Sequence, residues 1–103
     1  MQTDKHDVFL VMIVPKVYKD DLVDVLLSLE MVGGFHLFPI QGFSHEHAYY
    51  NLQEQVTGYQ TFYRFELAHS KINSDILVSR LKEQIAGKSI RFWLLPLLGG
   101  GHF

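Results

Sequence analysis

The chain contains no cysteine among its 103 residues, which excludes disulfide bonds, thiolate nucleophiles and zinc sites built from cysteine. It also has no excess of basic residues, since nine Lys and Arg stand against eleven Asp and Glu, for a net charge of -2. Non-specific binding of nucleic acid needs a basic surface that neutralises phosphates. We therefore expect no nucleic-acid partner.

Long hydrophobic segments are absent as well. The two longest apolar runs, at 8–15 and 92–98, are far shorter than the ~20 residues that cross a bilayer, so we expect buried strands there and no membrane insertion. The N-terminus is polar and acidic, and it lacks the basic start and apolar core of a secretory signal peptide. A cytoplasmic location is the resulting expectation.

The composition that is present is typical of a small globular protein. Hydrophobic residues make up 48% of the chain and charged residues 19%, and no low-complexity run interrupts it. A chain of this length builds one modest core rather than two. We predict a single domain over residues 1–103, with flexible ends at 1–6 and 99–103.

Four segments have the pattern of β-strands. Residues 8–14 form a continuous apolar run, and residues 59–68 alternate between the two faces of a strand. The segment 35–41 contains Pro39, which lacks an amide donor, so this strand should lie at an edge of the sheet or lead into a bulge. A fourth strand is predicted at 90–95.

Two segments have apolar residues at helical spacing. We expect the first helix to stop at Gly33-Gly34, and the second to be capped by Asn73 or Ser74 and to end before Gly87. The apolar stripes are Leu22, Val25, Leu26 and Leu29 in the first helix, and Leu77, Leu81 and Ile85 in the second.

The order β-α-β-β-α-β is the signature of the ferredoxin-like α+β fold, in which two helices cover one face of a four-stranded antiparallel sheet. The other face stays bare. The strands at 8–14 and 90–95 are apolar on both sides, and Phe62 adds an aromatic ring to the third strand. Because soluble monomers seldom expose a broad apolar surface, we predict a homo-oligomer in which another subunit covers this face.

The stretch Gly42 to Tyr50, "GFSHEHAYY", contains three candidate metal ligands, His45, Glu46 and His47. Imidazole and carboxylate suit zinc, copper or nickel, and a His-x-His pair in an extended segment projects both rings to the same side. Two histidines do not complete a site, so another histidine or the same loop of a second subunit has to contribute. The other reading is a solvated polar loop. The remaining histidines are His6, His36, His69 and His102.

Catalysis finds little support in the sequence. The residues "IQGF" in a ferredoxin-like domain raise the comparison with acylphosphatases, but no arginine lies near Gly42 and Phe43 to hold a phosphate. Ser44 and His45 are adjacent, yet nucleophilic catalysis also needs an orienting acid and an oxyanion hole. We predict a non-enzymatic protein without catalytic residues.

Four stretches together resemble a known family: "DDLVDVLL" at 20–27, "GGF...FPIQGFSHEH" at 33–47, "EQVTGYQTFYRFEL" at 54–67 and "RFWLLPL" at 91–97. The chain from residue 8 to residue 97 resembles a small family of uncharacterised bacterial PII-like proteins. The most specific parts of the resemblance are the "EQVTG" stretch and the Trp-x-x-Pro motif within those segments.

The resemblance implies a ferredoxin-like subunit, usually trimeric, related in shape to PII signal transducers and to CutA, the divalent-cation tolerance protein. It also implies that the polar connection between the second and third strands takes the place of the PII loop that touches partner proteins. We thus predict a PII-like regulator that senses a small ligand or a protein partner through residues 43–57. The candidate residues are Phe43, Ser44, Tyr49, Tyr50, Glu54 and Gln55.

The alternative is a CutA-like protein that binds copper, zinc or nickel through His45, Glu46 and His47 and is linked to metal tolerance. The resembling family often accompanies heavy-metal efflux systems, and a divalent transition metal is the cofactor this reading implies. PII proteins hold ATP phosphates partly through a glycine-rich loop between the second helix and the fourth strand. Here that connection is only Ala86-Gly87-Lys88-Ser89, which argues against PII-type nucleotide binding.

Overall fold

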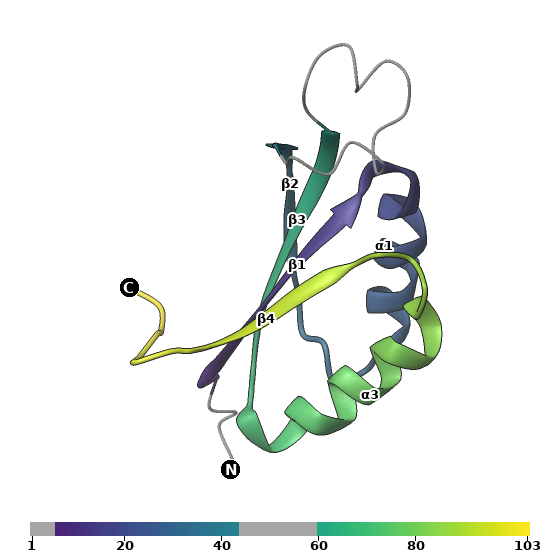
Figure 1. Ribbon diagram of the computed structural model, residues 1–103. Coiled ribbons are helices and arrows are strands. Elements are labelled where there is room, and N and C mark those ends of the chain that lie inside the picture. The colour runs from purple at the N-terminus through teal and green to yellow at the C-terminus, as the bar shows by residue number, and fades with distance from the viewer. Residues whose placement is uncertain (1–5, 44–59) are drawn as a thin grey trace.

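The structure, a computed structural model, describes residues 6–43 and 60–103 (Figure 1). Its sheet has the strand order β2-β3-β1-β4, and each neighbouring pair is antiparallel. Helices α1 and α3 cover one face of this sheet (Figure 1). The predicted ferredoxin-like fold is confirmed. The elements are β1 (Val8–Pro15), η1 (Lys16–Tyr18), α1 (Lys19–Ser28), β2 (His36–Gly42), β3 (Gln60–His69), η3 (Lys71–Asn73), α3 (Ser74–Ile85) and β4 (Arg91–Pro96).

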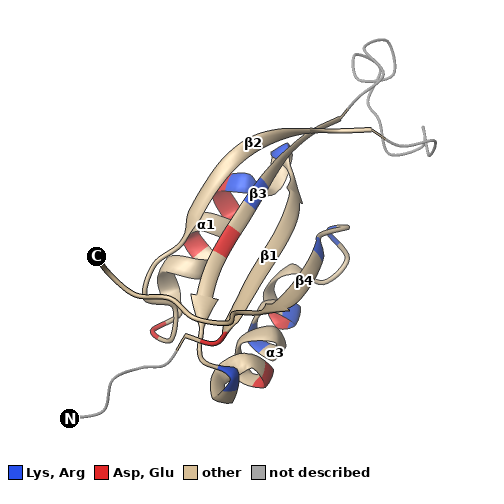
Figure 2. Cartoon of the chain, turned by 90° about the vertical axis from the view of Figure 1, so that its left-hand side faces the viewer, with Lys and Arg blue, Asp and Glu red and all other residues tan. Residues whose placement is uncertain are grey.

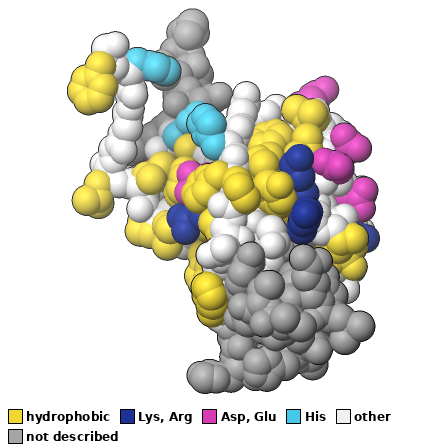
Figure 3. Space-filling model, turned by 90° about the horizontal axis from the view of Figure 1, so that it is seen from above, with side chains coloured by type: hydrophobic (Ala, Val, Ile, Leu, Met, Phe, Trp, Pro, Cys, Tyr) yellow, Lys and Arg dark blue, Asp and Glu magenta, His cyan; other side chains and the backbone are white. Residues whose placement is uncertain are grey.

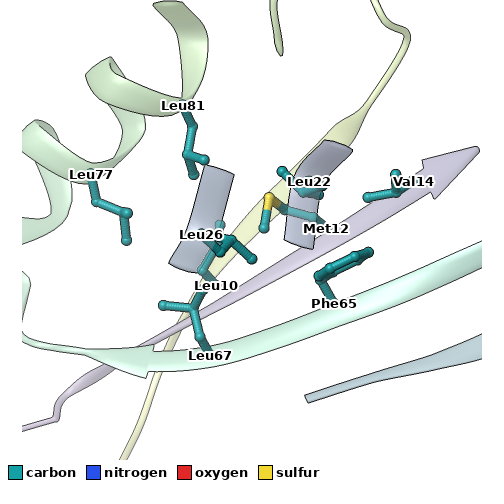
Figure 4. Packing of buried hydrophobic residues seen from close by; sticks show 9 residues of the cluster. All are labelled: Leu10, Met12, Val14, Leu22, Leu26, Phe65, Leu67, Leu77 and Leu81. Carbon is teal, nitrogen blue, oxygen red and sulfur yellow. The ribbon is translucent and has the colours of Figure 1, made fainter. Parts of the chain in front are cut away.

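The hydrophobic core lies between the sheet and the two helices (Figure 4). Strand β1 supplies every second residue to it, and β3 supplies Phe65 and Leu67 in the same alternation. The helices contribute the stripes that their sequence spacing predicted. The cluster consists of Leu10, Met12, Val14, Leu22, Leu26, Phe65, Leu67, Leu77 and Leu81, all at most 5% exposed.

Strand β2 lies at one edge of the sheet, as the proline in it predicted. Pro39 faces Tyr63 of β3, and the outer side of β2 has no partner strand among the described residues. Because an edge strand leaves one row of amide positions unpaired, the missing donor of Pro39 is tolerated there.

Strand β4 lies at the opposite edge of the sheet. The sequence predicted a buried strand at 92–98, and the structure shows an exposed one. Its four central residues are 42–46% exposed, because β4 pairs only with β1 and no other described strand covers its outer side. The apolar sequence of β4 therefore reflects a surface that is open in the single chain. These residues are Phe92, Trp93, Leu94 and Leu95.

Both helix boundaries differ in detail from the sequence reading. Helix α1 ends at Ser28 rather than at the glycines at 33–34, because Leu29 already takes an extended backbone with φ -95° and ψ 112°. Asn73 precedes α3 but forms no side-chain cap, and Ser74 bonds elsewhere. Gly87 lies just beyond α3 with φ 83°, as expected for a helix stop. No helix in the described ranges is long and apolar enough to cross a membrane.

Candidate functional site

The predicted ligand and metal residues fall in the connection between β2 and β3. Among them the structure describes only Phe43, whose side chain is 68% exposed just after the end of β2. The others lie outside the described residues, and their assignments stay predictions: Ser44, His45, Glu46, His47, Tyr49, Tyr50, Glu54 and Gln55.

The base of this connection is held by the β2–β3 ladder. Gly42, the last residue of β2, faces Gln60, the first residue of β3, and Ile40 faces Phe62 two positions further in. Gly42 and Gln60, which flank the segment 43–59, are therefore side by side at one end of the sheet. The Phe62 ring lies against Gly42 so closely that a Cβ atom there would meet its edge. Glycine thus lets the ring pack at the base of the connection.

We call the sheet face opposite α1 and α3 the open sheet face. Its alternating residues are largely apolar, and Phe38, Trp93 and Leu95 are 42%, 46% and 43% exposed. Apolar side chains also cover much of the described surface seen from above (Figure 3). As predicted, no described helix covers this face, although Val11 at its centre is only 3% exposed. Its members include Phe9, Val11, Ile13, His36, Phe38, Ile40, Phe62, Arg64, Glu66, Ala68, Arg91, Trp93 and Leu95.

Charged groups on the open sheet face are few, and two of them form an ion pair. Arg64 Nε lies 2.8 Å from Glu66 Oε2, so these two residues form an ion pair within β3. The Arg91 guanidinium lies 5.8 Å from the centre of the Trp93 ring, within the range of a cation–π contact. Most other charged residues lie on the helices and turns (Figure 2). This face therefore suits an apolar partner surface.

A second polar arrangement lies where β1 begins and β3 ends, and sequence reasoning missed it. His69 is only 3% exposed, and its Nε2 atom lies 2.7 Å from the hydroxyl oxygen of Ser74. Its Nδ1 atom is buried without a hydrogen-bond partner among the described residues. Burial lowers the pKa of His69 below its usual value of 6.5, while the carboxylate of Asp7 acts in the opposite direction and His6 acts with burial.

Asp7 joins several elements at this end of the sheet. Its Oδ1 atom accepts a hydrogen bond of 2.7 Å from the backbone N–H of Lys71, at the start of η3. Its own N–H donates to the carbonyl of His69, and its carbonyl accepts from the N–H of Leu97. Asp7 therefore ties β1 to the end of β3 and to the residue that follows β4. The sequence signal for this role was only an acidic residue before a strand, which is too common to be diagnostic.

The described residues hold no cluster of three or more His, Asp or Glu side chains that could bind a metal ion. His36 is exposed on β2, and His69 is buried at the other end of β3 from Gln60. Within the described ranges, neither His36 nor His69 therefore belongs to a preformed cluster that could complete a metal site with His45 and His47.

Comparison with solved structures defines the class of this fold. The chain is similar to CPII, a nitrogen regulatory PII-like protein from Thiomonas intermedia K12 whose structure is bound to ADP, AMP and bicarbonate. The TM-score is 0.69, and the alignment covers 94% of this chain and 96% of CPII at 13% sequence identity. The chain thus has a PII-like, ferredoxin-like fold.

The family follows from the sequence match. The model of the DUF3240 family, described as a protein of unknown function, matches residues 4–103, so the chain belongs to this family. A DUF3240 family protein from Shewanella baltica OS155 is 32% identical, with a TM-score of 0.76 over 100% of this chain and 99% of that one. No curated protein matches the chain. The resemblance to an uncharacterised PII-like family is confirmed.

Proposed function

We propose that this protein is a non-enzymatic PII-like regulator that senses a small ligand or a protein partner through residues 43–57. The observation that carries the proposal is the base of the β2–β3 connection, where pairing continues to Gly42 and Gln60. A long polar segment that leaves and returns at one end of a paired sheet is presented by a rigid scaffold. That is the arrangement expected of a recognition loop.

We also propose that the protein is a homo-oligomer with three subunits, and the open sheet face supports this proposal. Its exposed Phe38, Trp93 and Leu95 form a broad apolar surface that water covers only at a cost. A second copy of the chain offers the same apolar face and neutral ion pair in return. The trimer itself comes from the resemblance to PII proteins, and a cytoplasmic location accords with that class.

The ligand class is suggested by the relative with a similar fold. The structure of CPII contains bound ADP, AMP and bicarbonate, which are all anions. We carry over to this chain only that small anions are the first ligands to test, because the two sequences are 13% identical. The residues proposed to meet a ligand or partner are Phe43, Ser44, Tyr49, Tyr50, Glu54 and Gln55.

The loop is tested by replacement at constant length. In one variant, residues 46–56 become a glycine-serine segment, while Gly42 and Gln60 keep the ladder at its base. Calorimetric titration with bicarbonate, and with ADP and AMP for comparison, should show that the natural chain binds at least one of these anions and that the variant does not. Equal binding to both proteins would remove the loop from the site.

Metal binding is the second candidate function, supported by the His-x-His sequence at His45 and His47. Copper, zinc and nickel would be held by these two rings and Glu46, together with the same loop of a neighbouring subunit. The test compares the double variant His45→Ala and His47→Ala with the natural chain. Loss of metal binding in the double variant supports the site.

A further inference from the structure

The buried imidazole of His69 joins the end of β3 to the start of α3. It is 3% exposed, and its Nε2 atom lies 2.7 Å from the hydroxyl oxygen of Ser74, the first residue of α3. Ser74 is itself only 9% exposed, so this contact is shielded from water. The other ring nitrogen, Nδ1, is also buried and has no hydrogen-bond partner among the described residues. The ring therefore closes the junction between β3 and α3 through one of its two nitrogens.

The neutral form of the His69 ring fits this position, and the protonated form does not. With its proton on Nε2, the neutral ring donates to Ser74 and leaves only a bare acceptor at Nδ1. Protonation makes both nitrogens donors, so an N–H group at Nδ1 would be buried without an acceptor. A buried donor without an acceptor is destabilising, and more so when it is charged. The positive N-terminal end of the α3 dipole adds to the destabilisation.

Asp7 is the carboxylate that can supply the missing acceptor. Its Oδ1 atom accepts a hydrogen bond of 2.7 Å from the backbone N–H of Lys71 in η3, and its own N–H donates to the carbonyl of His69. Its negative charge favours the imidazolium, whereas His6 opposes it. The other charged residues at the junction are Lys71 itself and Asp75 in the first turn of α3. The Asp7 carboxylate thus has two competing donors, the N–H of Lys71 and a protonated His69.

We propose that His69 is a pH-sensitive latch at the β3–α3 junction. The neutral ring holds η3 and the start of α3 against the end of β3. The protonated ring leaves its buried position and pairs with the carboxylate of Asp7, which then releases the N–H of Lys71. The switch takes up one proton from the solvent and returns it when the pH rises, and no covalent bond to carbon changes.

The direction of the pH response follows from the burial of the ring. Burial lowers the pKa of His69 in the closed junction, whereas an exposed imidazole has a pKa of ~6.5. The open junction therefore binds the proton more readily, so the latch is closed at neutral pH and opens as the pH falls below about 6.5. The latch uses no residue between 43 and 59, so it stands apart from the proposed loop function.

The test is a pH titration of the ¹⁵N-labelled full chain, followed by NMR from about pH 8 to pH 5. The ring nitrogens of His69 should titrate below about pH 6.5, and the Lys71 amide signal should move upfield with the same midpoint as it loses its carboxylate partner. The exchange protection of that amide should fall by up to about tenfold per pH unit, because opening is linked to the uptake of one proton. The amide signals of Met12 and Phe65, at the centre of the sheet, should not move with this midpoint.

Two variants and a control separate the latch from general effects of acid. His69→Gln keeps a polar group beside Ser74 but cannot take up a proton, so the Lys71 amide should no longer follow the pH. Asp7→Asn keeps an oxygen that accepts from Lys71 but removes the charge that favours the imidazolium, so the midpoint of His69 should move to lower pH. The control His36→Gln, at an exposed position of β2, should leave the transition unchanged.

Three results would overturn the latch. They are a Lys71 amide that titrates equally in the natural chain and in His69→Gln, a His69 ring that titrates while the Lys71 amide stays fixed, and a midpoint that Asp7→Asn does not move. Circular dichroism checks that the variants stay folded. If His69→Gln does not fold, Asp7→Asn decides by itself, because Asp7 lies outside the hydrophobic core. None of these results bears on ligand binding by the 43–57 segment, which the loop replacement tests by itself.

Discussion

Replacing Leu95 by glutamate should dissociate the proposed oligomer. Leu95 lies on the open sheet face opposite Phe9 of β1 and is 43% exposed in the single chain. Full burial of a leucine side chain contributes about 1.5–3 kcal/mol, so covering the exposed part contributes about 1 kcal/mol per subunit. An unpaired carboxylate in the same apolar contact costs at least about 2 kcal/mol more. The sum of about 3 kcal/mol weakens association more than 100-fold.

The assay is light scattering on a sizing column at micromolar concentration, with Leu27→Glu as the matched control. Leu27 is 72% exposed on α1, away from the open sheet face, so the same substitution there should leave the mass unchanged. Circular dichroism checks that both variants stay folded. A natural chain that is monomeric at this concentration, or two variants of equal mass, would refute the reasoning.

Three further predictions follow. Burial lowers the pKa of His69, so the unfolded state binds the proton more readily than the folded state. The free energy of unfolding should therefore fall as the pH drops below about 6.5, by at most ~1.4 kcal/mol per pH unit. Thermal unfolding of His69→Gln should depend less on pH between about pH 5 and 7. Gly42→Val should lower stability by about 1 kcal/mol, because its Cβ displaces the Phe62 ring; an unchanged denaturation midpoint would contradict that contact. His45→Ala should weaken nickel binding at least about tenfold if the ring is a ligand, and unchanged calorimetric affinity would exclude it.

The fold was predictable because its signals are local. The alternation in β3 and the stripe of Leu77 and Leu81 each reflect a repeat that the backbone imposes, and their order fixes the ferredoxin-like arrangement. Pro39 even located an edge strand. The exposure of Phe92 and Leu94, on the helix side of β4, was not predictable, because an apolar strand has the same sequence whether the covering surface comes from its own chain or from another.

The polar contacts were harder to predict for a related reason. Ser74 stands where a helix cap is expected, but its hydroxyl group lies beside His69, five residues earlier on the preceding strand. Asp7 and Lys71 are 64 positions apart, and only the completed fold brings them together. The ligand and metal assignments in the β2–β3 connection rest on sequence pattern and family resemblance alone, and for residues 44–57 they remain predictions.

The most direct test of the central proposal is native mass spectrometry of the full chain, alone and with ADP, AMP, bicarbonate, copper, zinc and nickel in turn. A PII-like sensor predicts a trimer that gains the mass of at least one of these ligands, and loses that gain when residues 46–56 are replaced by the glycine-serine segment. A monomer that gains no mass from any of the six would contradict both the oligomer and the sensing role.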